Sequence, residues 1–376
     1  MHVYIPALPR PPSQALLGRG LPRPTIPAAT GAVPWARPGR EQSATIYCGA
    51  VRLSKVIRAT AWGVVVAGVA APLLRKRVSA PPLATQTVAF AAPLALCLAV
   101  RRSPTRDVAV CTLQMWAYLA AYKTPHDDEA AQAERVHIDY PLDIDRVIGL
   151  GELPTLRLQR ALARVDSETG GPRWRVLDRV LVWAHWTWFM VPHGTLLYIL
   201  VRRPERFPRA AVMTYAVFDI GASVYWLAPT APPWYAASMA GRRAGSEARR
   251  EDRGAEDVRR MMVEYGEHFW GDGWGPLYSV LGGNPLAAMP SLHFATSVMA
   301  ALLLAEAGPL AGALGWSYAA ALGFALVYLG EHYAVDLIAG AVLTAAVRRL
   351  GPATQPAFTR FARAIAALEA VAHEAG

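Results

Sequence analysis

Residues 284–297, NPLAAMPSLHFATS, and residues 327–340, VYLGEHYAVDLIAG, border strongly apolar segments and carry two histidines and an aspartate. An ionisable side chain next to such a segment is costly, so its presence indicates a function. His332 and Asp336 are four residues apart and share one face of a helix. Roughly 39 residues separate His293 from His332, about the length of one helix out and one helix back. We therefore expect both histidines at the same membrane surface.

The composition predicts a multi-span membrane protein made of helices. The chain has 376 residues, of which 53% are hydrophobic and 18% charged, with a mean hydropathy of +0.22. A soluble protein of this size is normally more charged. The formal net charge of +10 comes almost wholly from arginines that flank apolar segments, which argues against a nucleic-acid partner. Three cysteines make no disulfide framework.

The order of segments predicts five regions. A proline- and arginine-rich stretch cannot build a core and predicts a disordered N-terminal tail over residues 1–55. N-terminal transmembrane helices follow over 56–122, an extracytoplasmic interfacial loop over 123–178, a transmembrane catalytic core over 179–350 and an amphipathic tail over 351–376. The expected spans are 57–74, 82–100, 107–122, 179–201, 210–228, 289–307, 311–330 and 333–347.

Basic flanking residues predict the orientation. Placing the three arginine clusters in the cytoplasm gives eight spans with both termini inside; the clusters are Arg101, Arg102 and Arg106, then Arg202, Arg203, Arg206 and Arg209, then Arg348 and Arg349. The basic cluster at residues 75–77 then lies on the extracytoplasmic side, which is contrary to the rule. The predicted location is the cell membrane, with the His332 turn on the extracytoplasmic side. Apolar residues from Val147 to Leu158, among them Leu153 and Leu156, predict a short interfacial amphipathic segment.

The residues themselves favour phosphoryl transfer through a covalent histidine. Asp336 would hold one tautomer of His332, leaving the other ring nitrogen free to attack an electrophile. His293 would protonate the leaving group, and backbone N–H groups near Ser291 would favour a phosphate. Zinc bound by the two histidines and Asp336, or a proton path in a transporter, are weaker alternatives. We expect no metal and no cofactor.

Two motifs carry a resemblance to a known family. Pro290-Ser291-Leu292-His293 and His332-x-x-x-Asp336 resemble the second and third signature motifs of the type 2 phosphatidic acid phosphatase superfamily. The resemblance implies an all-α polytopic bundle of about six core helices plus N-terminal spans. It also implies that His293 is the acid/base, that His332 is the nucleophile and that Asp336 orients His332.

The sequence departs from that family pattern in three places. Leu292 stands where the second motif usually has glycine, and Ala325 and Leu326 stand where the third motif usually has Ser-Arg. Leu196 stands where the first motif has its lysine. The phosphate-binding cations of the superfamily are therefore absent or moved. The candidates lie in loop 242–260, with Arg242, Arg243, Arg249 and Arg250 foremost, although a mixed-charge run is more often a solvated surface.

A second resemblance, over residues 180–347, is to the inositolphosphotransferase branch (inositol phosphorylceramide synthases). It is carried by MPSLH, by GEHYAVDLIAG and by residues 229–234, PTAPPW. Pro229, Thr230 and Trp234 form either a wall of the headgroup pocket or a rigid turn. Glu331 either serves the acid/base chemistry or is a surface residue at a helix start.

The resemblances imply a lipid or polyprenyl phosphate as the substrate. Transfer of a phospho-headgroup is favoured over hydrolysis by a lipid or polyprenyl phosphate phosphatase. Outside the motifs, we expect His185 and His193 to be packing residues and Asp219 to pair with a polar group inside the bundle.

Overall fold

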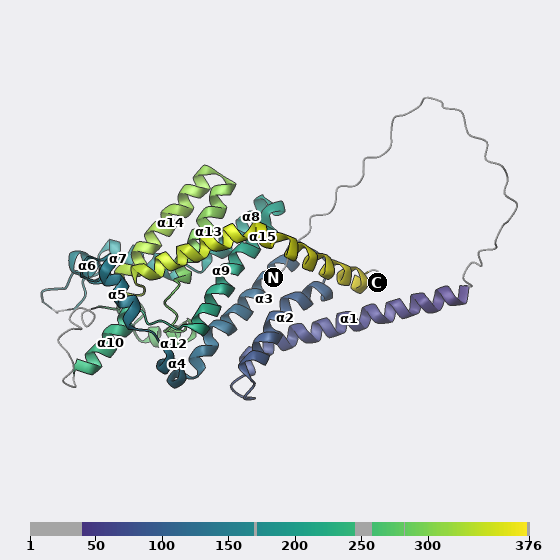
Figure 1. Cartoon of the computed structure of the whole chain (residues 1–376), viewed down its shortest axis with the longest axis horizontal. Helices are drawn as coiled ribbons and strands as arrows, with labels where there is room; N and C mark the ends of the chain where they lie inside the picture. The colour runs from purple at the N-terminus through teal and green to yellow at the C-terminus, as the bar shows by residue number, and fades with distance from the viewer. Residues whose placement is uncertain (1–39, 169–170, 245–257, 282, 374–376) are drawn as a thin grey trace, which may run out of the picture.

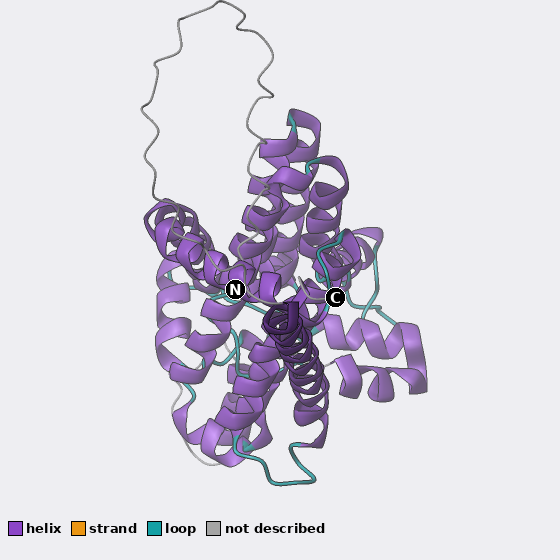
Figure 2. Cartoon of the chain, turned by 90° about the vertical axis from the view of Figure 1, so that its right-hand side faces the viewer, coloured by secondary structure: helices purple, strands orange, loops and turns teal. Residues whose placement is uncertain are grey.

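The fold is a bundle of helices. The computed structural model describes residues 40–168, 171–244, 258–281 and 283–373, and this part contains helices and loops without a strand (Figures 1 and 2). The α-helices are α1 (Arg40–Leu74), α2 (Pro82–Ala99), α3 (Pro104–Lys123), α4 (Glu129–Arg135), α5 (Asp139–Ile148), α6 (Pro154–Leu162), α7 (Val176–Trp186), α8 (Met190–Arg202), α9 (Phe207–Leu227), α10 (Pro233–Ala244), α11 (Met261–Trp270), α12 (Trp274–Leu281), α13 (Leu292–Ala307), α14 (Pro309–Tyr328) and α15 (Ala334–His373). The all-α prediction is confirmed.

Several helices have the length and composition of membrane spans. Within the described residues, four segments are long and apolar enough to cross a membrane: Val51–Leu74, Pro82–Ala99, Pro204–Leu227 and Pro309–Tyr328. α13 is apolar but shorter. Much of the surface of these segments faces outward, which is expected when the solvent on that side is lipid. The chain is therefore a multi-pass membrane protein.

The expected span 179–201 is not one helix. α7 ends at Trp186 and α8 begins at Met190, with hydrogen-bonded turns between them. The interruption turns Trp188 inward, where its indole N–H donates to Thr296 of α13 at 3.0 Å. An interhelical hydrogen bond satisfies an indole that would otherwise be buried without a partner.

Both ends of the chain differ from their expected form. Residues 40–55, which the sequence assigns to the tail, lie in α1; residues 1–39 of that tail lie outside the described residues. The C-terminal tail continues α15 as one 40-residue helix through Pro352 and Pro356. It docks on the N-terminal helices, because Glu369 pairs with Arg102 and Arg106. Figure 1 shows α15 running from the end of the bundle at α5 to α1.

Arginines from two of the predicted clusters meet at the C-terminal end of α13. Arg209 and Arg348 both bind the Glu306 carboxylate, at 2.6 and 2.8 Å. Arg206 donates to the Glu306 carbonyl oxygen at 2.8 Å. His293 is at the opposite end of α13, so these cations lie a helix length away from it.

The close crossing of α13 and α15 decides where the two histidines lie. Asp336, Gly340 and Thr344 follow one another at four-residue intervals and are buried on one face of α15. Thr344 donates to the Ala295 carbonyl oxygen at 2.8 Å, and Gly340 lies against the Ser291 carbonyl oxygen. A small residue at such a crossing allows two backbones to approach closely.

Replacing Gly340 with alanine should force this crossing apart. A Cβ at this position would lie 2.6 Å from the Ser291 carbonyl oxygen, a backbone atom that cannot move aside alone. We expect Gly340→Ala to lower the melting temperature in detergent, at a cost of about 1–3 kcal/mol, as is typical of overpacking. Gly63→Ala is the control, because a Cβ there meets nothing within 4 Å. Equal melting temperatures for the two variants would contradict the close crossing.

Candidate functional site

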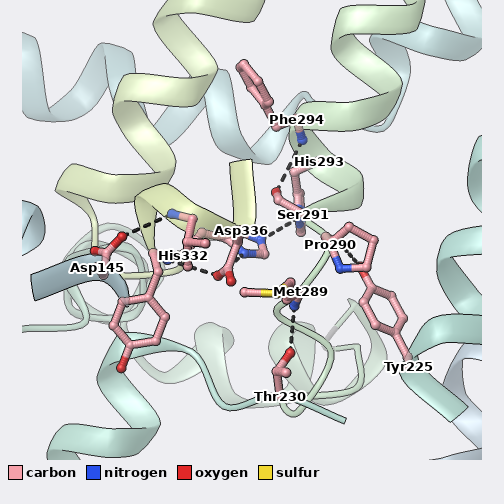
Figure 3. A network of polar contacts seen from close by, with 12 residues as sticks. Asp145, Tyr225, Thr230, Met289, Pro290, Ser291, His293, Phe294, His332 and Asp336 are labelled. Carbon is pink, nitrogen blue, oxygen red and sulfur yellow. Dashed lines mark hydrogen bonds and ion pairs between the residues drawn. The ribbon is translucent and has the colours of Figure 1, made fainter. Parts of the chain in front are cut away.

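The site is built where α13 and α15 begin. The Ser291 hydroxyl oxygen accepts a hydrogen bond from the Phe294 N–H and caps α13. The Ser291 N–H donates to the Asp336 carbonyl oxygen at 2.9 Å, which ties the two helix starts together. Figure 3 shows Asp336 between His332 and the Ser291 backbone. Since the Ser291 side chain is fully buried in this cap, it supports the site from beneath.

Asp336, His332 and His293 form a continuous hydrogen-bonded line. Asp336 Oδ2 lies 3.2 Å from His332 Nδ1, and His332 Nε2 lies 3.2 Å from His293 Nδ1. The Tyr333 N–H also donates to Asp336 Oδ2, at 2.9 Å. A carboxylate only accepts, so His332 carries its proton on Nδ1 and presents Nε2 as the acceptor. The three side chains meet in the structure, as predicted.

His185 also belongs to this group, although the sequence suggested packing alone. Its ring stacks on His293 with centroids 5.1 Å apart, and Trp188 covers His293 with centroids 4.1 Å apart. The buried Nδ1 of His185 has no hydrogen-bond partner among the described residues. His193 lies elsewhere, with Nδ1 2.7 Å from the Phe189 carbonyl oxygen. The placement of His185 between Trp183 and Trp186 is the one sequence signal that could have singled it out.

Glu331 is largely, although not fully, buried in an ion pair beside His332. Its carboxylate lies 3.0 Å from Arg260 Nε and is 10% exposed. The Arg260 guanidinium also donates to the Tyr278 hydroxyl at 2.8 Å and lies 3.7 Å above the Trp234 ring. Burial alone would lower the pKa of Arg260, but the Glu331 carboxylate outweighs burial and raises that pKa above its usual value. Glu331 is therefore not a surface residue.

The predicted cations and the proline-rich turn have different positions. Arg242 and Arg243 lie near the end of α10, and their side chains lie outside the described residues. Thr230 is buried, and its hydroxyl oxygen accepts from the Met289 N–H at 2.7 Å. The Pro229 carbonyl oxygen accepts from the His137 N–H at 2.9 Å. Thr230 therefore holds the loop that leads into α13, whereas Pro229 binds the segment before α5. Trp234 contacts Arg260, the cation paired with Glu331.

The expected interfacial segment forms part of the site's support. Ile144, Val147 and Leu150 are exposed, as an interfacial segment requires. Leu153 and Leu156, however, are buried in a cluster with Tyr333. The reason is that the turn between α5 and α6 directs these leucines onto the start of α15. Leu153 and Leu156 therefore pack on the protein, and the interfacial position of the segment stays a prediction.

Asp145 of α5 caps the helix that carries Asp336. Its Oδ1 accepts from the Val335 N–H at 3.0 Å, and its side chain is fully buried (Figure 3). Burial, reinforced by the nearby Asp336 and opposed by this hydrogen bond, raises the pKa of Asp145 to about 6. Nothing in the sequence marked this residue, because its partner is 190 residues away.

No set of donors in the described part of the chain forms a metal centre. No group of three or more histidine, cysteine, aspartate or glutamate side chains there is arranged to hold an ion. Asp336 lies behind His332, on the Nδ1 side, and the described oxygen contacts of its side chain are with His332 and the Tyr333 N–H.

Comparison with known proteins gives one match. Residues 173–350 match the family model described as the PAP2 superfamily. No curated protein and no solved structure shows a significant match to the chain. The matched region includes His185, Arg260, His293, His332 and Asp336.

The raised pKa of Asp145 makes a pH-dependent prediction. An unfolded aspartate titrates near about 3.9 and folded Asp145 near about 6, so the folded state binds the proton more tightly. Stability is therefore highest below pH ~4 and falls as the pH rises through ~6. Asp145→Asn keeps an acceptor for the Val335 N–H and removes the buried charge. Its melting temperature relative to wild type should rise between pH 4.5 and pH 7.5.

The exposed Asp143 in the same helix provides the control. Asp143→Asn should show no such change relative to wild type over this pH range. A difference between wild type and Asp145→Asn that does not change with pH would contradict the assignment.

Proposed function

We propose that the chain is a membrane phosphatase or phosphotransferase of the type 2 phosphatidic acid phosphatase superfamily, as its family match over residues 173–350 and its apolar helices support. In this proposal, His332 accepts a phosphate-linked group from a lipid and passes it on. The observation that carries this proposal is the hydrogen-bonded line from Asp336 through His332 to His293. A nucleophile, its orienting carboxylate and an acid/base side chain within hydrogen-bond reach are the parts that covalent catalysis needs.

In the first step, His332 Nε2 attacks the phosphorus. The new Nε2–P bond forms as the bond from phosphorus to the lipid oxygen breaks, and His293 gives that oxygen a proton. Asp336 keeps its hydrogen bond to Nδ1–H and stabilises the positive charge on the phosphorylated ring. When the substrate binds, the phosphate group enters between His332 and His293 and breaks the hydrogen bond between their rings. His293 then donates to the lipid oxygen instead of to His332 Nε2.

In the second step, an acceptor hydroxyl replaces the histidine. His293 takes the proton of the hydroxyl, the acceptor oxygen attacks phosphorus and the P–Nε2 bond breaks. Both the proton on His293 and the free Nε2 of His332 are thereby restored. Water as the acceptor gives a phosphatase, and a lipid or polyol hydroxyl gives a phosphotransferase.

The burial of the nucleophile favours headgroup transfer over hydrolysis. His332 is 4% exposed, and α6 and the segment before α11 are joined at the end of α14, shortly before His332 in the chain. The Gln159 side chain binds the carbonyl oxygens of Arg259 and Tyr328, which fastens the two segments together. A site that excludes water protects a reactive intermediate until an organic hydroxyl enters. We propose an inositolphosphotransferase-like reaction, with Pro229, Thr230, Ser291 and Trp234 supporting the headgroup site.

The active end is proposed to face the extracytoplasmic side of the cell membrane. The arginines gathered on Glu306 mark the other end of α13. Because basic residues flanking spans favour the cytoplasm, His293 and His332 then lie on the opposite side.

Loss of His332 should abolish labelling of the protein, whereas loss of His293 should only slow it. Purified protein is incubated with a phospholipid labelled at phosphorus, and acid-labile protein-bound label is measured. His332→Ala should carry no label, because the attacking nitrogen is gone. His293→Ala should label roughly 10²–10⁴-fold more slowly, the usual contribution of general acid catalysis.

The exposed His268 of α11 gives a matched control, and His268→Ala should label like the wild type. Label on His332→Ala equal to wild type would rule out the phosphohistidine at this position.

An acceptor titration distinguishes transfer from hydrolysis. A short-chain inositol phospholipid labelled in its headgroup is supplied with increasing ceramide or diacylglycerol. We expect the label to move into a new lipid in proportion to acceptor, because water is excluded from the buried intermediate. Release of all label as water-soluble inositol phosphate at every acceptor concentration would identify a hydrolase instead.

A further inference from the structure

Arg260 is a half-buried cation held in a fixed orientation beside the site. Glu331 binds its Nε and Nη2 atoms, at 3.0 and 3.3 Å, and Nη2 also donates to Tyr278. Its guanidinium carbon lies 3.7 Å above the Trp234 ring. Nη1 makes no hydrogen bond among the described residues. The group therefore has an aromatic floor, a carboxylate on one edge and one unused terminal nitrogen.

The backbone fixes this cation relative to His332. The Met261 N–H donates to the Leu329 carbonyl oxygen at 3.1 Å, just after Arg260 and just before the Gly330 turn. Gly330 has φ of 82° and a Cβ there would lie 2.5 Å from the Arg259 carbonyl oxygen, so this close contact requires glycine. Glu331 is the residue next to His332.

We propose that Arg260 binds the phosphate of the substrate and that Glu331 is a resident counter-anion which the phosphate displaces. The identity of the ligand rests on the proposed function; the exchange of one anion for another on Arg260 does not. A guanidinium matches the geometry of two phosphate oxygens as well as that of a carboxylate. Trp234 holds the guanidinium plane during the exchange, and Nη1 is available for a second contact.

The exchange explains why a neutralised arginine lies at a phosphate site. A partly desolvated guanidinium without an anion is destabilising, and Glu331 reduces that cost while the site is empty. An arriving phosphate must compete with this carboxylate, so Glu331 reduces affinity for weakly charged ligands. Removing the negative charge of Glu331 should therefore strengthen phosphate binding, whereas a merely structural ion pair would be weakened by the same change.

Binding of inorganic phosphate tests the proposal without turnover. Calorimetry is done on detergent-solubilised full-length protein carrying His332→Ala, so that no covalent step contributes. In this background, Arg260→Gln should weaken phosphate binding at least ~10-fold and Glu331→Gln should tighten it several-fold, by loss of the competing anion. Arg260→Lys, which keeps the charge but not the planar fork, should fall between parent and Arg260→Gln.

Arg259 provides the matched control, since it is adjacent in sequence and is paired with Glu264. Arg259→Gln in the same background should bind phosphate like its parent. Unchanged binding in Arg260→Gln, or weaker binding in Glu331→Gln, would overturn the proposal. If Arg260→Gln does not fold, the proposal is overturned when Arg260→Lys binds phosphate like its parent and Glu331→Gln binds phosphate more weakly.

These outcomes are separate from those that test the phosphohistidine. Failure of wild-type protein to form an acid-labile label, with phosphate binding still dependent on Arg260, would refute the covalent mechanism and leave the anion site. Normal labelling in Arg260→Gln with undiminished phosphate binding would refute the anion site and leave the covalent mechanism.

Discussion

The hydrogen bond from the Ser291 N–H to the Asp336 carbonyl oxygen is the constraint on which the site depends. It joins the first turns of α13 and α15, two helices that α14 separates in the chain. Gly340 removes the side chain that would keep these backbones apart, and Thr344 adds a second interhelical bond one turn further on. Because His293 and His332 flank this contact, their ring nitrogens meet without needing flexible loops to bring them together.

Negative charge gathers at these helix starts for a physical reason. The first N–H groups of a helix have no intrahelical partner, and the helix dipole adds positive potential there. Asp336 accepts from the Tyr333 N–H, and Asp145 accepts from the Val335 N–H. Glu331 lies just outside the same turn and is neutralised by Arg260 instead. The α15 start therefore holds two carboxylates through its own backbone, and the third requires a separate cation.

What the sequence could predict was local in the chain. His332 and Asp336 share a helix turn, and His293 follows a proline at a helix start, so the meeting of these side chains could be inferred from the sequence. Arg260 and Asp145 act on the same turn from 71 and 190 residues away, which no spacing reveals. The break between α7 and α8 contains no proline or glycine at residues 187–189. Conversely, Pro352 and Pro356 lie inside α15 and do not end it, although a proline usually breaks a helix.

The departures from the superfamily pattern have structural counterparts elsewhere in the bundle. Leu292 replaces a glycine, and Gly221 of α9 supplies the space: a Cβ at 221 would lie 2.3 Å from Leu292 Cδ2. The small residue at this contact is thus on α9 and not on α13, and the two helices still pack closely. Ala325 and Leu326, at the positions of Ser-Arg, are fully buried in the apolar core. A cation therefore cannot come from α14 in this chain, and the segment before α11 brings Arg260 to the same end of the bundle.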